Sequence, residues 1–237
     1  MDPKILIFDT AVEAAEACGD RILELLAGAR IARGVTSLAV SGGSTPRLMF
    51  QSMAMRPFDW TGVELFQVDE RGVPPDHELS NFRMIRETLL GKIRIADGQV
   101  HRMRAELSAA EAAHAYEEEI RRVFDLGPAG IPVFDVIQRG MGPDGHTASL
   151  FPGEPLIANR TGIVAAVHVE KMKQDRITLL PAVLERARHT LCLVSGHDKA
   201  AALREVLRGK VNPMAWPSQI ALDASAWYID KAAASQL

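Results

Sequence analysis

The residues best suited to catalysis lie in one glycine-rich loop, Gly140-Met-Gly-Pro-Asp-Gly-His146. A histidine titrates near neutral pH, so His146 is able to take up and return a proton under physiological conditions. A loop of this kind runs over the surface, where its side chains face ligands rather than a core. The carboxylate of Asp144 can orient the imidazole and stabilise its protonated form. We therefore expect His146 to act as a general base that Asp144 holds in place.

The same loop matches the G-x-G-x-x-G pattern of dinucleotide-binding folds through Gly140, Gly142 and Gly145. That pattern requires a tight turn followed by a helix, and Pro143 interrupts the turn. Pro152-Gly153 then cuts short any following helix. The sequence contains neither a C-x-x-C nor an H-E-x-x-H motif for zinc. We therefore expect no nicotinamide or other cofactor, and no metal.

A second glycine-rich segment, Val40–Pro46, has the residue types of a phosphate site. Glycines let the backbone approach a ligand, hydroxyl groups donate hydrogen bonds, and a helix starting at Pro46 presents free N–H groups. The segment is not a Walker A loop, because no lysine follows its glycines at the required spacing. A plain strand-to-helix turn has a similar composition, so this segment alone leaves both interpretations open. The candidate phosphate ligands are Ser41, Gly42, Gly43, Ser44 and Thr45.

Charged residues elsewhere in the chain supply further candidates. Asp69 and Arg71 follow an apolar segment, where Asp69 can bind sugar hydroxyls and Arg71 a phosphate or a developing oxyanion. Arg176 and Lys199 offer positive charge in the C-terminal half. Each of these residues alone is also typical of a solvated surface loop. Together they are the partners that a phosphorylated substrate requires.

Short apolar segments alternate with segments of helical periodicity along the whole chain. This alternation predicts an α/β fold with a largely parallel sheet covered on both faces. Ligands of such sheets bind beyond the carboxyl ends of the strands, where the candidate loops lie. No repeat or long linker divides the chain, so we expect a single domain over residues 1–237. The predicted strands are 5–8, 37–40, 64–68, 133–138, 163–167, 190–195 and 227–230, and the predicted helices are 12–29, 46 onward, 81–90, 108–124, 181–188 and 198–207.

Length and composition narrow the class of protein. The 237 residues can bury a sizeable core, and the net charge of -3 does not favour a nucleic-acid or membrane partner. The N-terminus lacks the pattern of a signal peptide, and no run approaches the roughly 18 apolar residues of a membrane span. Cys18 and Cys192 lie in apolar segments and are expected to be reduced core thiols. We predict a cytoplasmic protein, either a monomer or a homodimer.

Taken together and in this order, the motifs resemble those of the 6-phosphogluconolactonase family. The similar segments are Ser41–Pro46, Asp69–Arg71 with Ser80-Asn81, Gly140–Gly153, Arg176–Thr178 and Gly196–Lys199. The resemblance extends from the first helix to the tail Trp227–Asp230, which is almost the whole chain. Any one of these motifs is a weak signal, whereas several in the same order are a strong one.

The resemblance implies a Rossmann-like three-layer α/β/α fold with a mostly parallel central sheet, shared with glucosamine-6-phosphate deaminases. It implies hydrolysis of 6-phospho-D-glucono-1,5-lactone to 6-phospho-D-gluconate in the oxidative pentose phosphate pathway. By position, the loop Ser41–Thr45, Arg176 and Lys199 hold the phosphate and His146 is the general base. A base-activated water suffices for a reactive lactone, and no G-x-S-x-G motif for a serine nucleophile is present. Arg71 serves either the oxyanion or the phosphate.

Two other functions are compatible with the same fold. A glucosamine-6-phosphate deaminase carries a glutamate close to its Asp and His. The next carboxylate here is Glu154, which lies beyond Pro152-Gly153. A non-catalytic sugar-phosphate sensor would keep the phosphate ligands but would have no need of His146.

The chain departs from the family pattern at two places. Arg139 occupies a position that is usually apolar, and its side chain either points to solvent or reaches the substrate. The segment 170–175 lacks the prolines that often precede the Arg-Ile-Thr motif, which leaves the roles of Lys171 and Lys173 open.

Overall fold

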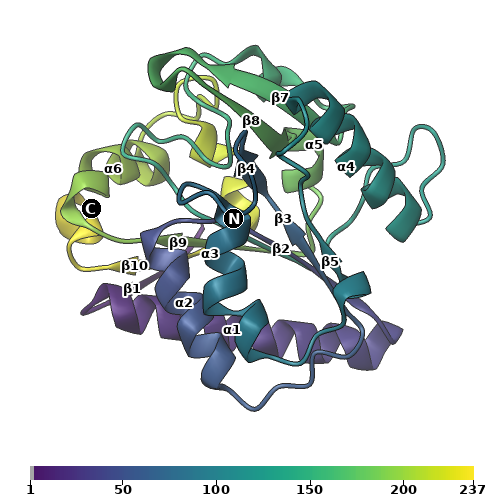
Figure 1. The fold of residues 1–237 in the computed structure, drawn as a ribbon. Coiled ribbons are helices and arrows are strands. Elements are labelled where there is room, and N and C mark those ends of the chain that lie inside the picture. Colours follow the sequence, from purple (N-terminus) through teal and green to yellow (C-terminus); the bar gives the residue numbers. More distant parts are fainter. Residues whose placement is uncertain (1–2) are drawn as a thin grey trace.

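A seven-stranded parallel sheet forms the centre of the protein in the computed structural model, which describes residues 3–237 (Figure 1). The strand order is β1-β10-β9-β6-β2-β3-β5, and each neighbouring pair runs parallel. Parallel neighbours require crossover connections, which the helices between the strands provide. The strands are β1 (Lys4–Phe8), β2 (Thr36–Val40), β3 (Val63–Gln67), β5 (Val100–His101), β6 (Val136–Arg139), β9 (His189–Val194) and β10 (Ser225–Asp230).

Helices cover both faces of this sheet and make three layers (Figure 1). One face carries α1 (Ala11–Arg33), α2 (Ser44–Met55) and α3 (Asn81–Thr88), and the other carries α4 (Ala109–Val123), α5 (Pro181–Leu184) and α6 (Ala200–Arg208). The predicted three-layer α/β/α fold with a mostly parallel sheet is confirmed. Within residues 3–237, no helix is both long and apolar enough to cross a membrane.

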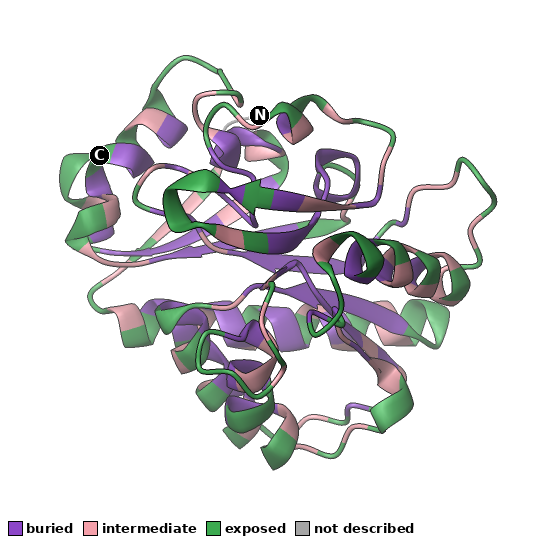
Figure 2. Ribbon diagram, turned by 45° about the horizontal axis from the view of Figure 1, so that its top comes forward, coloured by how far each residue is buried: buried purple, intermediate pink, exposed green. Residues whose placement is uncertain are grey.

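The continuous apolar character of the central strands follows from this cover on both faces. In β2, Leu38 and Val40 pack with α1 and α2, whereas Ala39 packs in the core on the opposite face. Figure 2 shows the strands of the sheet buried between helices whose outer surfaces are exposed. The two cysteines, Cys18 and Cys192, are buried and free, as expected of core thiols.

A second, three-stranded antiparallel sheet lies over one face, and the sequence does not predict it. It has the order β4-β8-β7, with β4 (Asp69–Arg71), β8 (Gln174–Leu179) and β7 (Val164–Val169). The strand predicted at 163–167 is present as β7, but it belongs to this second sheet and not to the parallel one. Only a short turn, 170–173, separates β7 from β8, which is too short for a parallel crossover, so the two strands pair as an antiparallel hairpin. β8 begins with polar and charged residues, so its sequence lacks the apolar pattern that would have predicted a strand.

Several predicted helix boundaries also differ from the structure, and α1 continues to Arg33 rather than ending at residue 29. α2 begins at Ser44 rather than at Pro46, because Gly43 serves as its N-cap. α5 ends at Leu184 rather than at residue 188, because the chain turns back there to enter β9. α6 begins at Ala200, after a single 3-10 turn, rather than at residue 198.

The strand order brings the candidate loops together. β9, β6, β2 and β3 are consecutive neighbours, and parallel strands end at the same edge of a sheet. The segments 195–199, 140–151, 41–46 and 69–71, which follow these four strands, therefore meet at that edge. Arg176 joins them because β8 pairs with β4.

Candidate active site

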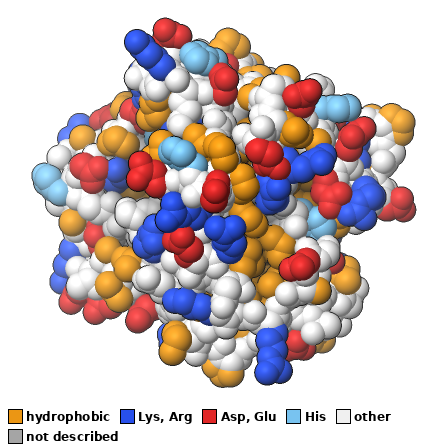
Figure 3. Space-filling model, viewed as in Figure 1, with side chains coloured by type: hydrophobic (Ala, Val, Ile, Leu, Met, Phe, Trp, Pro, Cys, Tyr) orange, Lys and Arg blue, Asp and Glu red, His pale blue; other side chains and the backbone are white. Residues whose placement is uncertain are grey.

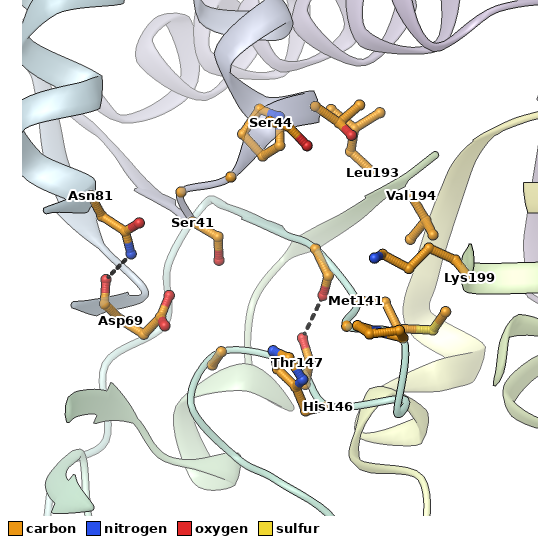
Figure 4. A pocket seen from close by; sticks show the side chains of 18 of the residues that line it. Ser41, Ser44, Asp69, Asn81, Met141, His146, Thr147, Leu193, Val194 and Lys199 are labelled. Carbon is orange, nitrogen blue, oxygen red and sulfur yellow. Dashed lines mark hydrogen bonds between the residues drawn. The ribbon is translucent and has the colours of Figure 1, made fainter. Parts of the chain in front are cut away.

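A cavity of about 340 Å³ lies where these segments meet (Figure 4). All the predicted site residues except Asp144 line it. They are Ser41, Gly42, Gly43, Ser44 and Thr45 after β2, Asp69 and Arg71 in β4, His146 after β6, Arg176 in β8 and Lys199 after β9. Figure 4 shows Asp69 and Asn81 on one side of the cavity and Lys199 on the other, with His146 between them.

The imidazole of His146 is held by the carboxylate of Asp144. The Nδ1 atom of His146 lies 2.5 Å from Oδ1 of Asp144, and the backbone N–H of His146 donates to the same oxygen at 3.2 Å. Burial raises the pKa of Asp144, but hydrogen bonds from His146 and Lys171 outweigh this effect and hold that pKa well below its usual value. Asp144 is therefore a carboxylate at neutral pH, and Nε2 of His146 is left to exchange a proton with a ligand.

Gly142 makes room for this pair, and Gly145 makes room for a neighbouring tryptophan ring. A Cβ atom at Gly142 would lie 2.0 Å from Nδ1 of His146 and 2.9 Å from Oδ1 of Asp144. Gly145 has a φ of 77°, and a Cβ atom there would lie 2.6 Å from the ring of Trp216. The backbone N–H of Gly142 donates to the His146 carbonyl at 2.9 Å and closes the turn. Gly142 and Gly145 of the glycine pattern therefore each have a steric cause.

The loop between β2 and α2 presents hydrogen-bond donors to the cavity. Gly43 has a φ of 130°, which glycine adopts readily, and the first turn of α2 receives no side-chain cap from the described residues. The hydroxyl groups of Thr45 and Ser195 lie 2.5 Å apart and tie this loop to the end of β9. The buried hydroxyl of Ser41 has no hydrogen-bond partner within residues 3–237. An anion in the cavity can accept hydrogen bonds from these groups.

Arg71 is fixed in position on the side of the cavity that carries Asn81. Its Nη1 atom donates to the Leu79 carbonyl at 2.8 Å and to Oδ1 of Asn81. The side-chain amide of Asn81 in turn donates to the Asp69 carbonyl at 2.9 Å. A Cβ atom at Gly42 would lie 1.8 Å from Oδ1 of Asn81, so a glycine is required there. Asn81 is thus a site residue to which the sequence assigns no role beyond its place in a family motif.

Glu70 is a structural residue between two residues of the site. It is buried and does not line the cavity. Its carboxylate joins β4 to the start of α3, because it accepts hydrogen bonds from the side chains of Gln67 and Ser80 and from the backbone N–H groups of Arg71, Asn81 and Phe82. A buried carboxylate requires such partners. A run of three charged residues does not reveal this role in the sequence.

Positive groups border the cavity on two sides. Arg71 and Arg176 are register partners between β4 and β8, and both of their Nε atoms are buried with no hydrogen-bond partner among the described residues. Burial lowers the pKa of Arg176; Asp69 opposes this effect and the charge of Arg71 adds to it. Lys199 contacts the carboxylate of Asp198. Figure 3 shows Lys and Arg side chains gathered near the centre of this view, although the whole chain carries a net charge of -3.

Arg139 neither points to solvent nor lines the cavity, so both expectations for it are wrong. Its side chain is fully buried, and its guanidinium donates to the Ile220 carbonyl and to the Ser225 hydroxyl. The reason is that β6 is the central strand of a sheet covered on both faces, so its alternating side chains are buried on either face. The preceding residue, Gln138, faces the other side, where its Oε1 atom accepts a hydrogen bond from the backbone N–H of Ser41 at 3.2 Å.

Comparison with known proteins places the chain in a family. Residues 9–229 match the family model described as glucosamine-6-phosphate isomerases/6-phosphogluconolactonase. The chain belongs to this family. It is 36% identical over 212 residues to the 6-phosphogluconolactonase of Rattus norvegicus, and this alignment covers 86% of the present chain and 82% of the rat protein. It is 34% identical over 249 residues to the probable chloroplastic 6-phosphogluconolactonase 4 of Oryza sativa subsp. japonica, over 99% of this chain and 76% of that protein.

Solved structures of this family have the same fold. The 6-phosphogluconolactonase from Trypanosoma cruzi matches with a TM-score of 0.89 at 27% identity, over 100% of this chain and 98% of that chain. A monomeric glucosamine-6-phosphate deaminase matches with a TM-score of 0.82 at 18% identity, over 99% and 100% of the two chains. The second likeness shows the shared fold alone. The resemblance inferred from the motifs is confirmed.

Proposed function

We propose that the protein is a 6-phosphogluconolactonase, which hydrolyses 6-phospho-D-glucono-1,5-lactone to 6-phospho-D-gluconate in the oxidative pentose phosphate pathway. The observation that carries the proposal is the His146–Asp144 pair, which lies in one cavity with a set of anion-binding groups. Such a site can activate a water molecule next to a bound sugar phosphate. Family membership and the names of the rat and rice relatives support this substrate.

The phosphate of the substrate is assigned to the loop between β2 and α2 and to two cations. Ser41–Thr45 supply hydroxyl and backbone N–H donors, and Arg176 and Lys199 supply positive charge. The Ser41 hydroxyl and Nε of Arg176 are buried donors without another acceptor among the described residues. Asp69, which accepts a hydrogen bond from the Ser149 hydroxyl at 2.8 Å, is assigned to the sugar hydroxyls.

Hydrolysis begins with a proton transfer from water. Nε2 of His146 takes the proton while the water oxygen attacks C1 of the lactone, and Asp144 stabilises the imidazolium. The carbonyl π electrons move to the carbonyl oxygen and form a tetrahedral oxyanion. When the oxyanion collapses, the bond from C1 to the ring oxygen breaks and His146 returns its proton to that oxygen. The product is a carboxylic acid with a free hydroxyl, and the acid ionises at neutral pH.

The oxyanion requires a donor that is already in place before the reaction. Arg71 is the candidate, because hydrogen bonds to Asn81 and to the Leu79 carbonyl fix its guanidinium. Its register partner Arg176 is assigned to the phosphate, so Arg71 also borders that part of the cavity. The variant Arg71→Met separates the two roles. A loss of kcat assigns Arg71 to the oxyanion, whereas a rise in KM with kcat retained assigns it to the phosphate.

The site favours hydrolysis over deamination of an amino sugar. A deaminase needs additional acid–base groups to move protons between C1 and C2. Glu154 does not line the cavity and borders a separate hollow on the far side of the loop. The acidic residues that line the cavity, Asp69 and Asp198, are bound to Ser149 and to Lys199.

The test is the decay of the lactone, generated enzymatically in the assay, measured against its spontaneous hydrolysis. We expect the protein to accelerate decay and the variant His146→Ala to remove the acceleration, while 6-phosphogluconate still binds to the variant. Ammonia release from glucosamine 6-phosphate without accelerated lactone decay would assign the protein to the deaminases. Binding of 6-phosphogluconate with no turnover of either substrate would indicate a sensor.

We further propose a cytoplasmic location and a monomeric or homodimeric state. The buried free thiols of Cys18 and Cys192 suit a reducing compartment. Cell fractionation tests the location, and size-exclusion chromatography with light scattering tests the oligomeric state. Recovery in a secreted or membrane fraction, or a larger assembly, would contradict these proposals.

A further inference from the structure

Lys171 binds the side of Asp144 that faces away from His146. It lies in the turn between β7 and β8, at the segment that departs from the family pattern. Its ammonium contacts Oδ2 of Asp144, while Oδ1 of the same carboxylate is bound to Nδ1 of His146. Each oxygen of Asp144 is therefore held by a different partner, and the carboxylate cannot turn without losing one of them.

The ring of Phe151 packs against both partners of Asp144. Its centroid lies 4.2 Å from the centroid of the His146 ring and 4.5 Å from Nζ of Lys171. An ammonium over an aromatic face is attracted to the ring, so the contact with Phe151 also stabilises Lys171 in its position beside Asp144. Lys171 does not line the cavity, and it therefore acts at a distance from the substrate.

We propose that Lys171 is a positioning residue, which orients His146 through Asp144 and sets the pH range in which His146 works as a base. This inference rests on the proposed function, because it assigns Lys171 a part in the same reaction. The positive charge of Lys171 offsets part of the negative charge that Asp144 presents to the imidazole. Without Lys171, the full charge of Asp144 would favour the imidazolium, and a higher pH would be needed to free the base.

A substitution of Lys171 leaves the other charged side chains near His146 in place. Those that border its cavity are Asp69, Arg71, Arg176, Asp198 and Lys199, from β4, β8 and the segment after β9. None of them contacts Asp144 in the described part of the chain, where His146 and Lys171 are the partners of its carboxylate. Removing the ammonium of Lys171 therefore changes one charge, next to Oδ2 of Asp144 in the His146–Asp144 pair.

The test compares Lys171→Met with Lys173→Met. Both substitutions remove one ammonium from the same turn, but Lys173 is exposed and Asp144 is not among its partners. We expect Lys171→Met to lower kcat by about tenfold with little change in KM. We also expect the acidic limb of its pH profile to move up by about 0.5 to 1 pH unit, because a half-exposed charge is screened. Lys171→Arg should restore the limb, and Lys173→Met should match the wild-type protein.

A wild-type kcat and an unmoved acidic limb in Lys171→Met would overturn the proposal. A rise in KM without a change in the pH profile would also overturn it, since that result would make Lys171 a substrate ligand. NMR titration of the His146 ring in the substrate-free proteins provides a readout that needs no activity. If the wild-type protein does not accelerate lactone decay, the proposed function fails, and the titration still decides whether Lys171 controls His146. Thermal unfolding checks that each variant is folded.

Discussion

Arg71 on β4 and Arg176 on β8 are register partners in the small antiparallel sheet, and both border the same cavity. Residues that face each other in this way have side chains on one face, and like charges at such positions repel. The two buried Nε atoms have no acceptor among the described residues. The arrangement is therefore unfavourable for folding alone and favourable for binding an anion.

Replacement of Arg176 should weaken substrate binding without weakening the fold. In Arg176→Met, loss of a charged hydrogen bond of about 1.5 to 3 kcal/mol should raise KM by about 10- to 150-fold. Removal of one of two like charges should leave the melting temperature unchanged or higher. Inorganic phosphate should raise the melting temperature of the wild-type protein more than that of the variant. A variant with the wild-type KM would exclude Arg176 from the phosphate site.

A methyl group at position 142 should displace the catalytic base. In Gly142→Ala the new Cβ atom would overlap the imidazole of His146, so the ring must move. We expect kcat to fall by about 100-fold or more while the protein stays folded. A matched control is Gly28→Ala in α1, where an added Cβ atom would meet nothing within 4 Å. The control should keep full activity and gain about 0.5 to 1 kcal/mol of stability; equal kcat in both variants would contradict the steric argument.

The variant Asp144→Asn should retain the shape of the site but lose most of its catalytic activity. An amide can donate a hydrogen bond to Nδ1 of His146 and thereby favour the tautomer whose Nε2 carries a proton. That tautomer cannot act as a base at Nε2, so we expect kcat to fall by about 100-fold or more. Steady-state kinetics together with circular dichroism of the folded variant measure this effect. Retention of more than about half of the wild-type kcat would show that Asp144 does not set the tautomer.

Asp144 should also contribute stability that depends on pH. Its pKa is lower in the folded protein than in an unfolded chain, so its contribution is present above about pH 4 and is lost as the pH falls through the lowered value. The stability difference between the wild-type protein and Asp144→Asn should be largest near pH 7, at about 1 kcal/mol for a partly exposed group. Urea unfolding at a series of pH values measures this difference, and a difference that grew below pH 4 would reverse the sign of the argument.

The loss of charge at Glu70 should affect both stability and activity. In Glu70→Gln one side-chain oxygen is replaced by an NH₂ group, which cannot accept the hydrogen bonds made there, and we expect a loss of about 1 to 3 kcal/mol in the free energy of unfolding. Because Glu70 holds the backbone of Arg71 and Asn81, kcat/KM should fall as well. The same substitution at the exposed Glu78 is the control and should change stability by less than about 0.5 kcal/mol. Equal effects at the two positions would exclude the proposed role of Glu70.

Much of the site could be predicted because its parts are local in sequence. His146 and Asp144 meet within one turn, and Gly142 leaves room for the pair. The loop Ser41–Thr45 combines glycines with a helix start, which is again a property of adjacent residues. The alternation of strands and helices then indicated a parallel sheet, and the ends of its strands indicated where these loops would lie.

The sequence by itself thus determined the fold class, the family and the candidate residues that the cavity brings together, whereas it gave no role to others that line the cavity, such as Asn81. Only the tertiary structure decided which residues distant in sequence contact each other. The pairing of Arg71 with Arg176, the support of Arg71 by Asn81 and the contact of Lys171 with Asp144 depend on the small antiparallel sheet, which the sequence pattern does not reveal. Arg139 is buried for a similar reason, since the order of the strands places β6 in the centre of a sheet that is covered on both faces. Local preferences act between neighbours along the chain, whereas these contacts follow from the order and register of strands that are distant in sequence.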